Sequence, residues 1–281
     1  MAFQLGDRCP SLPENVLRAT VYKIHNHWIC SSFQPQIPRH SPHITTILDR
    51  IQFLPPSIRW SIAEFWATDN GEHIAQAIIK GNAIALSDGS FKNQRGASAW
   101  VIEGDNEIGR IKGWNMVPGS NEDQSAYRSE LTGLLALLVM TGEICKHHDI
   151  MEGSITIGCD GLSALEQTSG EEDIIPLRAS DYDILWVIRK RLQTLPIHVN
   201  FRHVRGHQDN KKPVDCLDRW ERLNVEMDAL AKHALIHFSN HPTHNLIEGE
   251  PWSVWYGDTK ITCNFHQTLY ELTRAPTSQD Y

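Results

Sequence analysis

Residues 83–90 read Ala-Ile-Ala-Leu-Ser-Asp-Gly-Ser, an apolar run that becomes polar at Asp88. A short apolar run bounded by turn-forming residues predicts a buried strand. A polar turn over 89–96 and further strand-like runs at 97–103 and 107–118 follow. Two such runs joined by a short turn that contains glycine indicate an antiparallel hairpin, which the third run extends into a meander.

The sequence after the meander alternates between helical and strand-like periodicity. Apolar residues such as Leu131, Leu134, Leu135 and Leu138 recur at helical spacing, whereas 154–159 is rich in β-branched residues. The predicted helices cover 126–147, 162–168, 181–195 and 220–238, and the predicted strands cover 154–159 and 197–204. The order β-β-β-α-β-α-α-β-α predicts an α/β fold with a five-stranded mixed sheet and helices on both faces.

The regular pattern occupies only part of the chain. Residues 1–81 are expected to form an irregular segment, with a proline-containing linker at 31–43 and one or two short helices at 44–66. Residues 82–238 are expected to form the α/β domain, and 239–281 a tail without clear periodicity.

The composition is typical of a globular protein, with 41% hydrophobic and 21% charged residues among 281. The formal net charge of -8 argues against a domain that binds nucleic acid mainly by nonspecific attraction. The six scattered cysteines include no Cys-x-x-Cys pair, which favours a reducing compartment. There is no secretory signal pattern and no run of about 18 apolar residues, so we expect an intracellular protein, cytoplasmic or nuclear, without a membrane span.

Two acidic residues follow strand-like runs. Asp88 and Asp160 each precede a glycine, and Asp-Gly is common in ordinary turns. Their position favours a functional role over an ordinary turn, because a polar side chain at the end of a buried strand is energetically costly without a partner. Strand ends are also where α/β folds place their sites.

Two further acidic residues lie in helical patterns. Glu130 borders the apolar stripe of its helix, although a solvated glutamate in a first turn is the simpler interpretation. Asp228 lies on a helix face of small residues. Glu221 and Glu226 could take the same role, and Asp228 could also be an ordinary surface residue. His207 follows Gly206 at a strand end, where a histidine is more often a structural hydrogen-bonding residue than a catalyst.

Four carboxylates gathered in one place repel one another and lose their charge unless a cation holds them. The four acids therefore suggest a divalent-metal site, for which metal-assisted phosphodiester cleavage is the natural chemistry.

Taken together, these residues resemble the ribonuclease H family. The matching motifs are Asp88-Gly89-Ser90, Arg128-Ser129-Glu130-Leu131, Cys159-Asp160, Val204-Arg205-Gly206-His207 and Asp228-Ala229-Leu230-Ala231. Each motif is short, but they occur in the family's order over about residues 82–238. The lead-in Ser-x-Tyr-Arg-x-Glu and the Gly-His-Gln-Asp stretch look most like the ribonuclease H portion of a retrotransposon-type reverse transcriptase.

The resemblance implies an endonuclease that cleaves the RNA strand of RNA/DNA hybrids, with two Mg²⁺ or Mn²⁺ ions as cofactors. A reverse transcriptase polymerase domain is a second candidate partner. The implied metal ligands are Asp88, Glu130, Asp160 and Asp228, with His207 assisting catalysis, and the implied substrate-binding residues are Ser90, Ser125 and Arg128.

Three alternatives stay open. The chain could be an inactive binding module with the same fold, within or left over from a reverse transcriptase. A related nuclease or transposase would generally use three acids and lack the Gly-His element. A zinc site is a weaker alternative, because the spacing of His25, His27, Cys30, His40 and His43 fits no familiar finger.

Overall fold

A computed structural model describes residues 2–5, 19–24, 27–32, 45–170, 175–176, 179–238, 247–249, 253–256, 259–262 and 265–274. Within these residues, the helices are α1 (Ile47–Gln52), α2 (Pro56–Arg59), α3 (Glu72–Lys80), α4 (Ala126–His147), α5 (Leu162–Ser169), α6 (Tyr182–Thr194), α7 (Arg219–His237) and α8 (Phe265–Arg274). Three short 3₁₀ turns cover Asp105–Glu107, Gln208–Asn210 and Val214–Cys216. The strands are β1 (Ala2–Leu5), β2 (Ala19–Ile24), β3 (His27–Ser32), β4 (Glu64–Ala67), β5 (Ala83–Lys92), β6 (Arg95–Glu103), β7 (Arg110–Met116), β8 (Ser154–Cys159), β9 (His198–His203), β10 (Ser253–Tyr256) and β11 (Thr259–Ile261).

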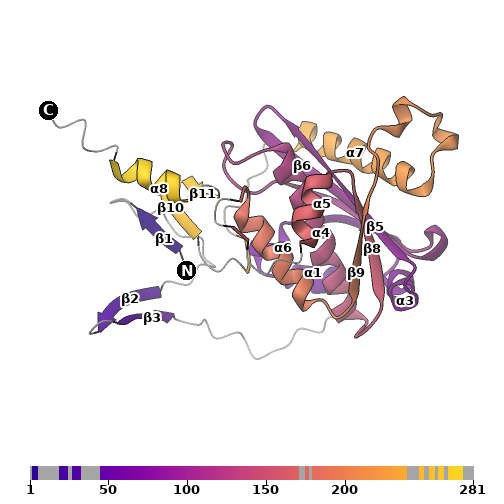
Figure 1. Ribbon diagram of the computed structural model, residues 1–281. Coiled ribbons are helices and arrows are strands. Elements are labelled where there is room, and N and C mark those ends of the chain that lie inside the picture. The colour runs from indigo at the N-terminus through magenta and orange to yellow at the C-terminus, as the bar shows by residue number, and fades with distance from the viewer. Residues whose placement is uncertain are drawn as a thin grey trace.

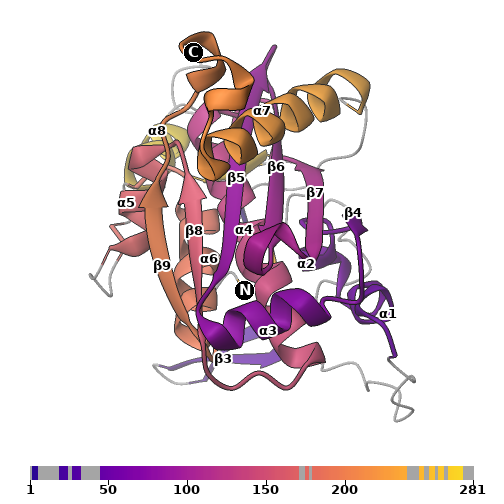
Figure 2. The ribbon, with the colours of Figure 1, turned by 90° about the vertical axis from the view of Figure 1, so that its right-hand side faces the viewer.

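The main sheet has six strands in the order β4-β7-β6-β5-β8-β9, so the expectation of five strands was wrong. The pairs among β4, β7, β6 and β5 are antiparallel, whereas β8 pairs in parallel with both β5 and β9. The sixth strand, β4, comes from the segment that the sequence pattern predicts to be irregular (Figure 2). Its four residues are too few to show a strand period, which explains why the pattern gave no sign of it.

The first hairpin is longer than the sequence pattern predicts. Strand β5 continues through Asp88 and Gly89, which pair with Ala99 and Ser98 of β6. The turn consists of Asn93 and Gln94, both at positive φ. Two such residues match the twist of a two-residue hairpin loop. The alternative that Asp88-Gly89 forms the turn is therefore wrong, and Asp88 lies inside the sheet.

Residues of β6 alternate between the two faces of the sheet, as the period of a strand requires. Trp100 and Ile102 belong to a core shared with α4, α5 and α6, whereas Ala99 and Val101 belong to a second core beneath α7. Figure 1 shows α7 on one side of the sheet and α4 with α6 on the other. The sheet is thus covered on both faces, which fixes the directions from which the helices approach its strand ends.

Local caps fix where the two long helices begin. The Oγ of Ser125 accepts a hydrogen bond from the backbone N–H of Arg128 at the start of α4. Asp218 and Glu221 form a reciprocal capping box at the start of α7. Such caps satisfy backbone N–H groups that have no partner within the helix.

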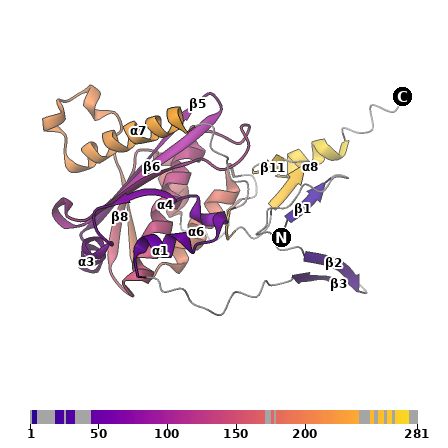
Figure 3. The same cartoon turned by 180° about the vertical axis from the view of Figure 1, so that it is seen from behind.

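The terminal segments also contain regular structure. Strand β1 pairs in parallel with β10, which pairs with β11, and Figure 3 shows this small sheet beside α8, away from α7. The division into an N-terminal segment (1–81), a domain (82–238) and a tail (239–281) stays a prediction. None of the helices in the described ranges is long and apolar enough to cross a membrane.

Candidate active site

Four structural elements bring acidic side chains to one place. Asp88 lies on β5, Glu130 in the second turn of α4, Asp160 directly after β8, and Asp228 in the middle of α7. The negative charges of Glu130, Asp160 and Asp228 all act on Asp88. The structure therefore brings together the four carboxyl groups that the sequence singles out.

Asp88 is the most buried of the four, with 5% of its surface exposed. Burial, together with the charges of the other three acids, raises the pKa of Asp88 to about 9, and the backbone N–H of Gly89 partly opposes this. Its Oδ2 accepts a hydrogen bond from Nδ2 of Asn224 at 3.0 Å. An anionic Asp88 is thus unfavourable unless positive charge is added nearby.

Glu130 is held from two sides. Its Oε1 accepts from the backbone N–H of Gly89 at 3.1 Å, and its Oε2 accepts from the thiol of Cys159 at 3.2 Å. Burial and the charge of Asp160 raise its pKa to about 8. A Cβ on Gly89 would lie 2.8 Å from the backbone nitrogen of Glu130, so only glycine lets β5 approach α4 this closely.

Asp160 lies between β8 and the start of α5. Burial raises its pKa and the charge of Asp228 adds to this, while the imidazoles of His207 and His203 oppose it. Nε2 of His203 lies 3.1 Å from the backbone oxygen of Asp160, within hydrogen-bonding distance. A Cβ on Gly206 would lie 2.3 Å from Oδ2 of Asp160, which accounts for glycine in the Gly-His pair.

Asp228 and His207 form the open side of the site. Nδ1 of His207 lies 4.0 Å from Oδ2 of Asp228, and 62% of the histidine side chain is exposed. The same Oδ2 also accepts from Nζ of Lys232, one turn further along α7, at 2.7 Å. His207 has φ of 53°, a left-handed conformation that is uncommon outside glycine.

Glu221 and Glu226, the other acids considered for the role of Asp228, have other partners. Glu226 pairs with Arg110 and Lys112 of β7, and Glu221 pairs with Lys212 and caps α7. The charge of Asp228, unlike theirs, is among the main influences on the pKa of Asp88.

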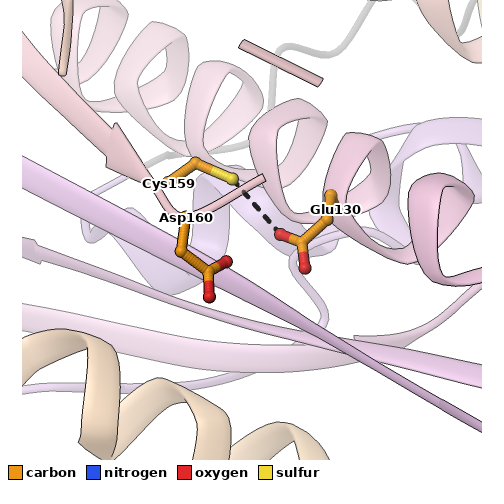
Figure 4. A group of neighbouring side chains, drawn as sticks. All are labelled: Glu130, Cys159 and Asp160. Atoms are coloured by element: carbon orange, nitrogen blue, oxygen red, sulfur yellow. Dashed lines mark hydrogen bonds between the residues drawn. The ribbon is translucent and has the colours of Figure 1, made fainter. Parts of the chain in front are cut away.

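Glu130, Cys159 and Asp160 form the tightest part of the site. One ligand-type atom from each lies within 4.8 Å of the others, and among the described residues this is the one group of three or more His, Cys, Asp or Glu side chains that meets this distance. Figure 4 shows the sulfur of Cys159 directed toward Glu130, with Asp160 beside it. Burial and the charge of Glu130 raise the pKa of this thiol well above its ordinary value, so Cys159 serves here as a hydrogen-bond donor.

The three implied substrate-binding residues differ in their surroundings. Ser90 is half-buried on β5, and Ser125 is half-buried with its hydroxyl engaged in the cap of α4. Arg128 is fully buried, and its guanidinium binds Asp181, Asp183 and the backbone oxygen of Pro118. The donors that make these bonds point into the protein, and the contact between Arg128 and substrate stays a prediction.

Sequence reasoning missed two supporting residues. Asn224 lies four residues before Asp228 on the same face of α7, and a buried amide inside a helix is a signal that could have been used. Cys159 was noted only as the residue before Asp160 in a motif and was given no role, because a cysteine in a strand is ordinarily a small core residue. Of the histidines and the cysteine weighed as a zinc site, His25, His40 and His43 lie outside the described residues.

The donor set fits a hard divalent cation. Asp88, Glu130 and Asp160 have raised pKa values because their carboxyl groups are desolvated and close to other anions. A cation bound by their oxygens would restore the charged forms, and oxygen donors are those that Mg²⁺ and Mn²⁺ prefer.

No protein-family model matches the chain, and no curated protein matches it. Three solved structures that resemble about half of it are RNase H domains. The N-terminal RNase H domain of Rv2228c from Mycobacterium tuberculosis, solved as a fusion with maltose-binding protein, is 15% identical; the match covers 54% of this chain and 97% of that one, with a TM-score of 0.33. RNase H1 from Halobacterium salinarum NRC-1 is 18% identical, over 55% and 97% of the two chains, with a TM-score of 0.33. LC11-RNase H1, solved in complex with RNA/DNA hybrid, is 12% identical, over 53% and 98%, with a TM-score of 0.35. Similarity at these values does not establish an activity.

Proposed function

We propose that this protein is a divalent-metal-dependent endonuclease of the ribonuclease H kind, which hydrolyses the RNA strand of RNA/DNA hybrids. The observation that carries the proposal is the convergence of four carboxyl groups from β5, α4, β8 and α7, two of them with pKa values of about 9 and 8. Raised carboxyl pKa values at one place are typical of sites that bind cations or perform acid-base chemistry.

Each acidic residue has a part in the proposed site. Asp88, Glu130, Asp160 and Asp228 would hold two Mg²⁺ or Mn²⁺ ions, and such ions would supply an activated water and stabilise the leaving oxygen of the phosphodiester. The hydrogen bonds from Gly89, Cys159 and Asn224 orient the carboxylates for this role.

His207 is the residue in the site best exposed for proton transfer. Its imidazole is largely exposed and near Asp228, so it can exchange a proton with solvent while it remains next to the acids. An imidazole can both accept and donate a proton through its ring nitrogens, which suits His207 to assist proton movement or product release.

The retroelement origin rests on sequence motifs alone. The Ser125-to-Glu130 lead-in and the Gly206-to-Asp209 stretch support a ribonuclease H of a retrotransposon-type reverse transcriptase, which would make a polymerase domain its partner. Recognition of the hybrid would depend on 2′-hydroxyl groups and backbone shape.

The test is cleavage of a hybrid labelled on its RNA strand, compared with duplex DNA and duplex RNA, in Mg²⁺ and in EDTA. We expect cleavage confined to the RNA of the hybrid, dependent on the metal and lost in Asp88→Asn and Asp160→Asn. Hybrid binding without cleavage under all metal conditions would favour the inactive binding module. Cleavage that persists in either variant would contradict the assigned site.

A further inference from the structure

A second cluster of charged side chains lies buried around Arg128, two residues before Glu130 on α4. The guanidinium of Arg128 donates to Asp181 at 2.7 Å and to both oxygens of Asp183 at 2.9 Å, and Nζ of Lys260 donates to Oδ2 of Asp183 at 2.9 Å. All four residues are less than 9% exposed. Two positive and two negative charges balance, which is the condition for keeping charges in the interior.

The fourth member of this cluster comes from the far end of the chain. Lys260 lies on β11, outside the range that carries the ribonuclease H motifs. The adjacent Thr262 makes two further contacts: its hydroxyl donates to Oδ1 of Asp123 at 2.9 Å, and its backbone oxygen accepts from the N–H of Tyr182 at 3.2 Å. Strand β11 is thus attached to the loop before α4 and to the start of α6, and through β10 it is connected to β1 (Figure 1).

Arg128 connects this cluster to the acidic site. It precedes Glu130 by two residues on α4, and its Nε donates to the backbone oxygen of Pro118 at 2.8 Å. Its side chain therefore joins the loop before α4, the first turn of α4 and the start of α6. Displacement of Arg128 would move the first turn of α4, and Glu130 follows at the start of the next turn.

Removal of Lys260 would unbalance the cluster. One guanidinium would then face two buried carboxylates, and a buried charge without compensation is relieved by protonation or by entry of water. Protonation of a carboxylate and entry of water would both weaken the ion pairs through which Arg128 fixes the start of α4.

We propose that Lys260 is a positioning residue for the acidic site, supplied by the C-terminal strand β11 and acting through Asp183 and Arg128 on Glu130. Its effect on metal binding rests on the proposed function, whereas its effect on the order of α4 does not. The segment 259–262 then contributes to the geometry of the acidic site in the ribonuclease H-like unit.

The test compares Lys260→Met with Lys260→Arg in the full-length chain. Hydrogen exchange without metal should accelerate in Lys260→Met at residues 118–131, while the central strand β5 keeps its wild-type rates. The dissociation constant for Mn²⁺, measured by calorimetry without nucleic acid, should rise about tenfold, the low end of the effect of residues that support metal ligands. Lys260→Arg should restore both quantities, because it returns the positive charge to Asp183.

Lys146→Met is the matched control, because Lys146 pairs with Glu143 near the opposite end of α4. It should change neither quantity. If Lys260→Met does not fold, Thr262→Val removes only the hydroxyl contact with Asp123 and should produce the same effects more weakly.

Unchanged exchange at 118–131 in the variants would overturn the proposal. So would faster exchange everywhere, or faster local exchange with an unaltered Mn²⁺ dissociation constant, since both indicate a structural role only. A wild-type protein that binds no Mn²⁺ would contradict the proposed function, and the exchange rates would then still decide whether Lys260 orders the start of α4.

Discussion

Nδ2 of Asn224 on α7 donates a hydrogen bond to Oδ2 of Asp88 on β5, across the interface between the helix and the sheet. Both side chains are buried, with 2% and 5% of their surfaces exposed. The contact ties the most buried acid of the site to the helix that carries Asp228.

Replacement Asn224→Ala should lower the free energy of unfolding by about 1–3 kcal/mol, because it leaves the buried Asp88 without this donor. Urea unfolding of the metal-free protein measures the change. Asn200→Ala, at an exposed position on β9, is the control and should stay within about 0.5 kcal/mol of the wild type. Equal stability of the two variants would mean that the hydrogen bond contributes nothing.

Replacement Asp88→Asn should have opposite effects on stability and on metal binding. An amide carries no charge, so it avoids both the desolvation of an anion and the repulsion from Glu130, Asp160 and Asp228. We expect the metal-free variant to gain at least about 1 kcal/mol, or about 2–4 °C in melting temperature. Addition of Mn²⁺ should raise the melting temperature of the wild type and leave that of the variant nearly unchanged. A variant that melts below the wild type without metal would contradict the raised pKa of Asp88.

The sequence predicted much of the fold because its elements carry strong periodic patterns. The expected helix at 126–147 agrees with α4, and the expected strand at 154–159 agrees with β8. Strand β4 could not be predicted, since four residues with one half-buried side chain show no alternation. The hairpin turn was misplaced because Asp88-Gly89 has the composition of a turn, yet Gly89 is needed for the close approach of Glu130.

The candidate site was predictable in its acids and not in the residues that support them. The motifs point to Asp88, Glu130, Asp160 and Asp228, and the structure brings these four together. The role of Arg128 could not be deduced, because its partners Asp181 and Asp183 lie more than 50 residues away in the sequence. A local motif does not reveal whether an arginine faces solvent or a buried aspartate.

Replacement Arg128→Met should destabilise the protein by about 3–5 kcal/mol, because it leaves Asp181 and Asp183 buried with Lys260 as the remaining cation of the cluster. A substrate contact would instead give a stable variant with weaker hybrid binding. Unfolding in urea, together with hybrid affinity in EDTA, distinguishes the two results. Arg189→Met, at a half-buried position on α6, provides a comparison for the loss of one guanidinium that is bonded to Gln167 and not to Asp181 or Asp183.

Replacement His207→Ala should slow hybrid cleavage by about 10–100-fold without abolishing it, as expected for a group that assists proton transfer. Because 62% of the side chain is exposed, the stability should change by less than about 0.5 kcal/mol. Single-turnover and steady-state rates show whether the chemical step or product release is affected. His233→Ala, on the exposed face of α7, is the control, and an unchanged rate for His207→Ala would remove this residue from the mechanism.

The buried cluster should also produce a distinct acid dependence of stability. Arg128 and Lys260 hold the pKa of Asp183 well below its usual value, although burial opposes them and leaves the pKa of neighbouring Asp181 raised. A carboxyl group whose pKa is lower in the folded state than in the unfolded state stabilises the folded protein. This stabilisation is complete above the pKa of the unfolded state, about 3.9, and decreases as the pH falls from there toward the pKa of the folded state. The free energy of unfolding of the wild type should therefore fall more steeply between about pH 5 and pH 3 than that of Asp183→Asn, which is less stable at pH 7 but lacks this titration. Urea unfolding at pH 7, 5, 4 and 3 measures both curves, and parallel curves would mean that Asp183 is not a charged partner of Arg128 and Lys260 in the folded protein.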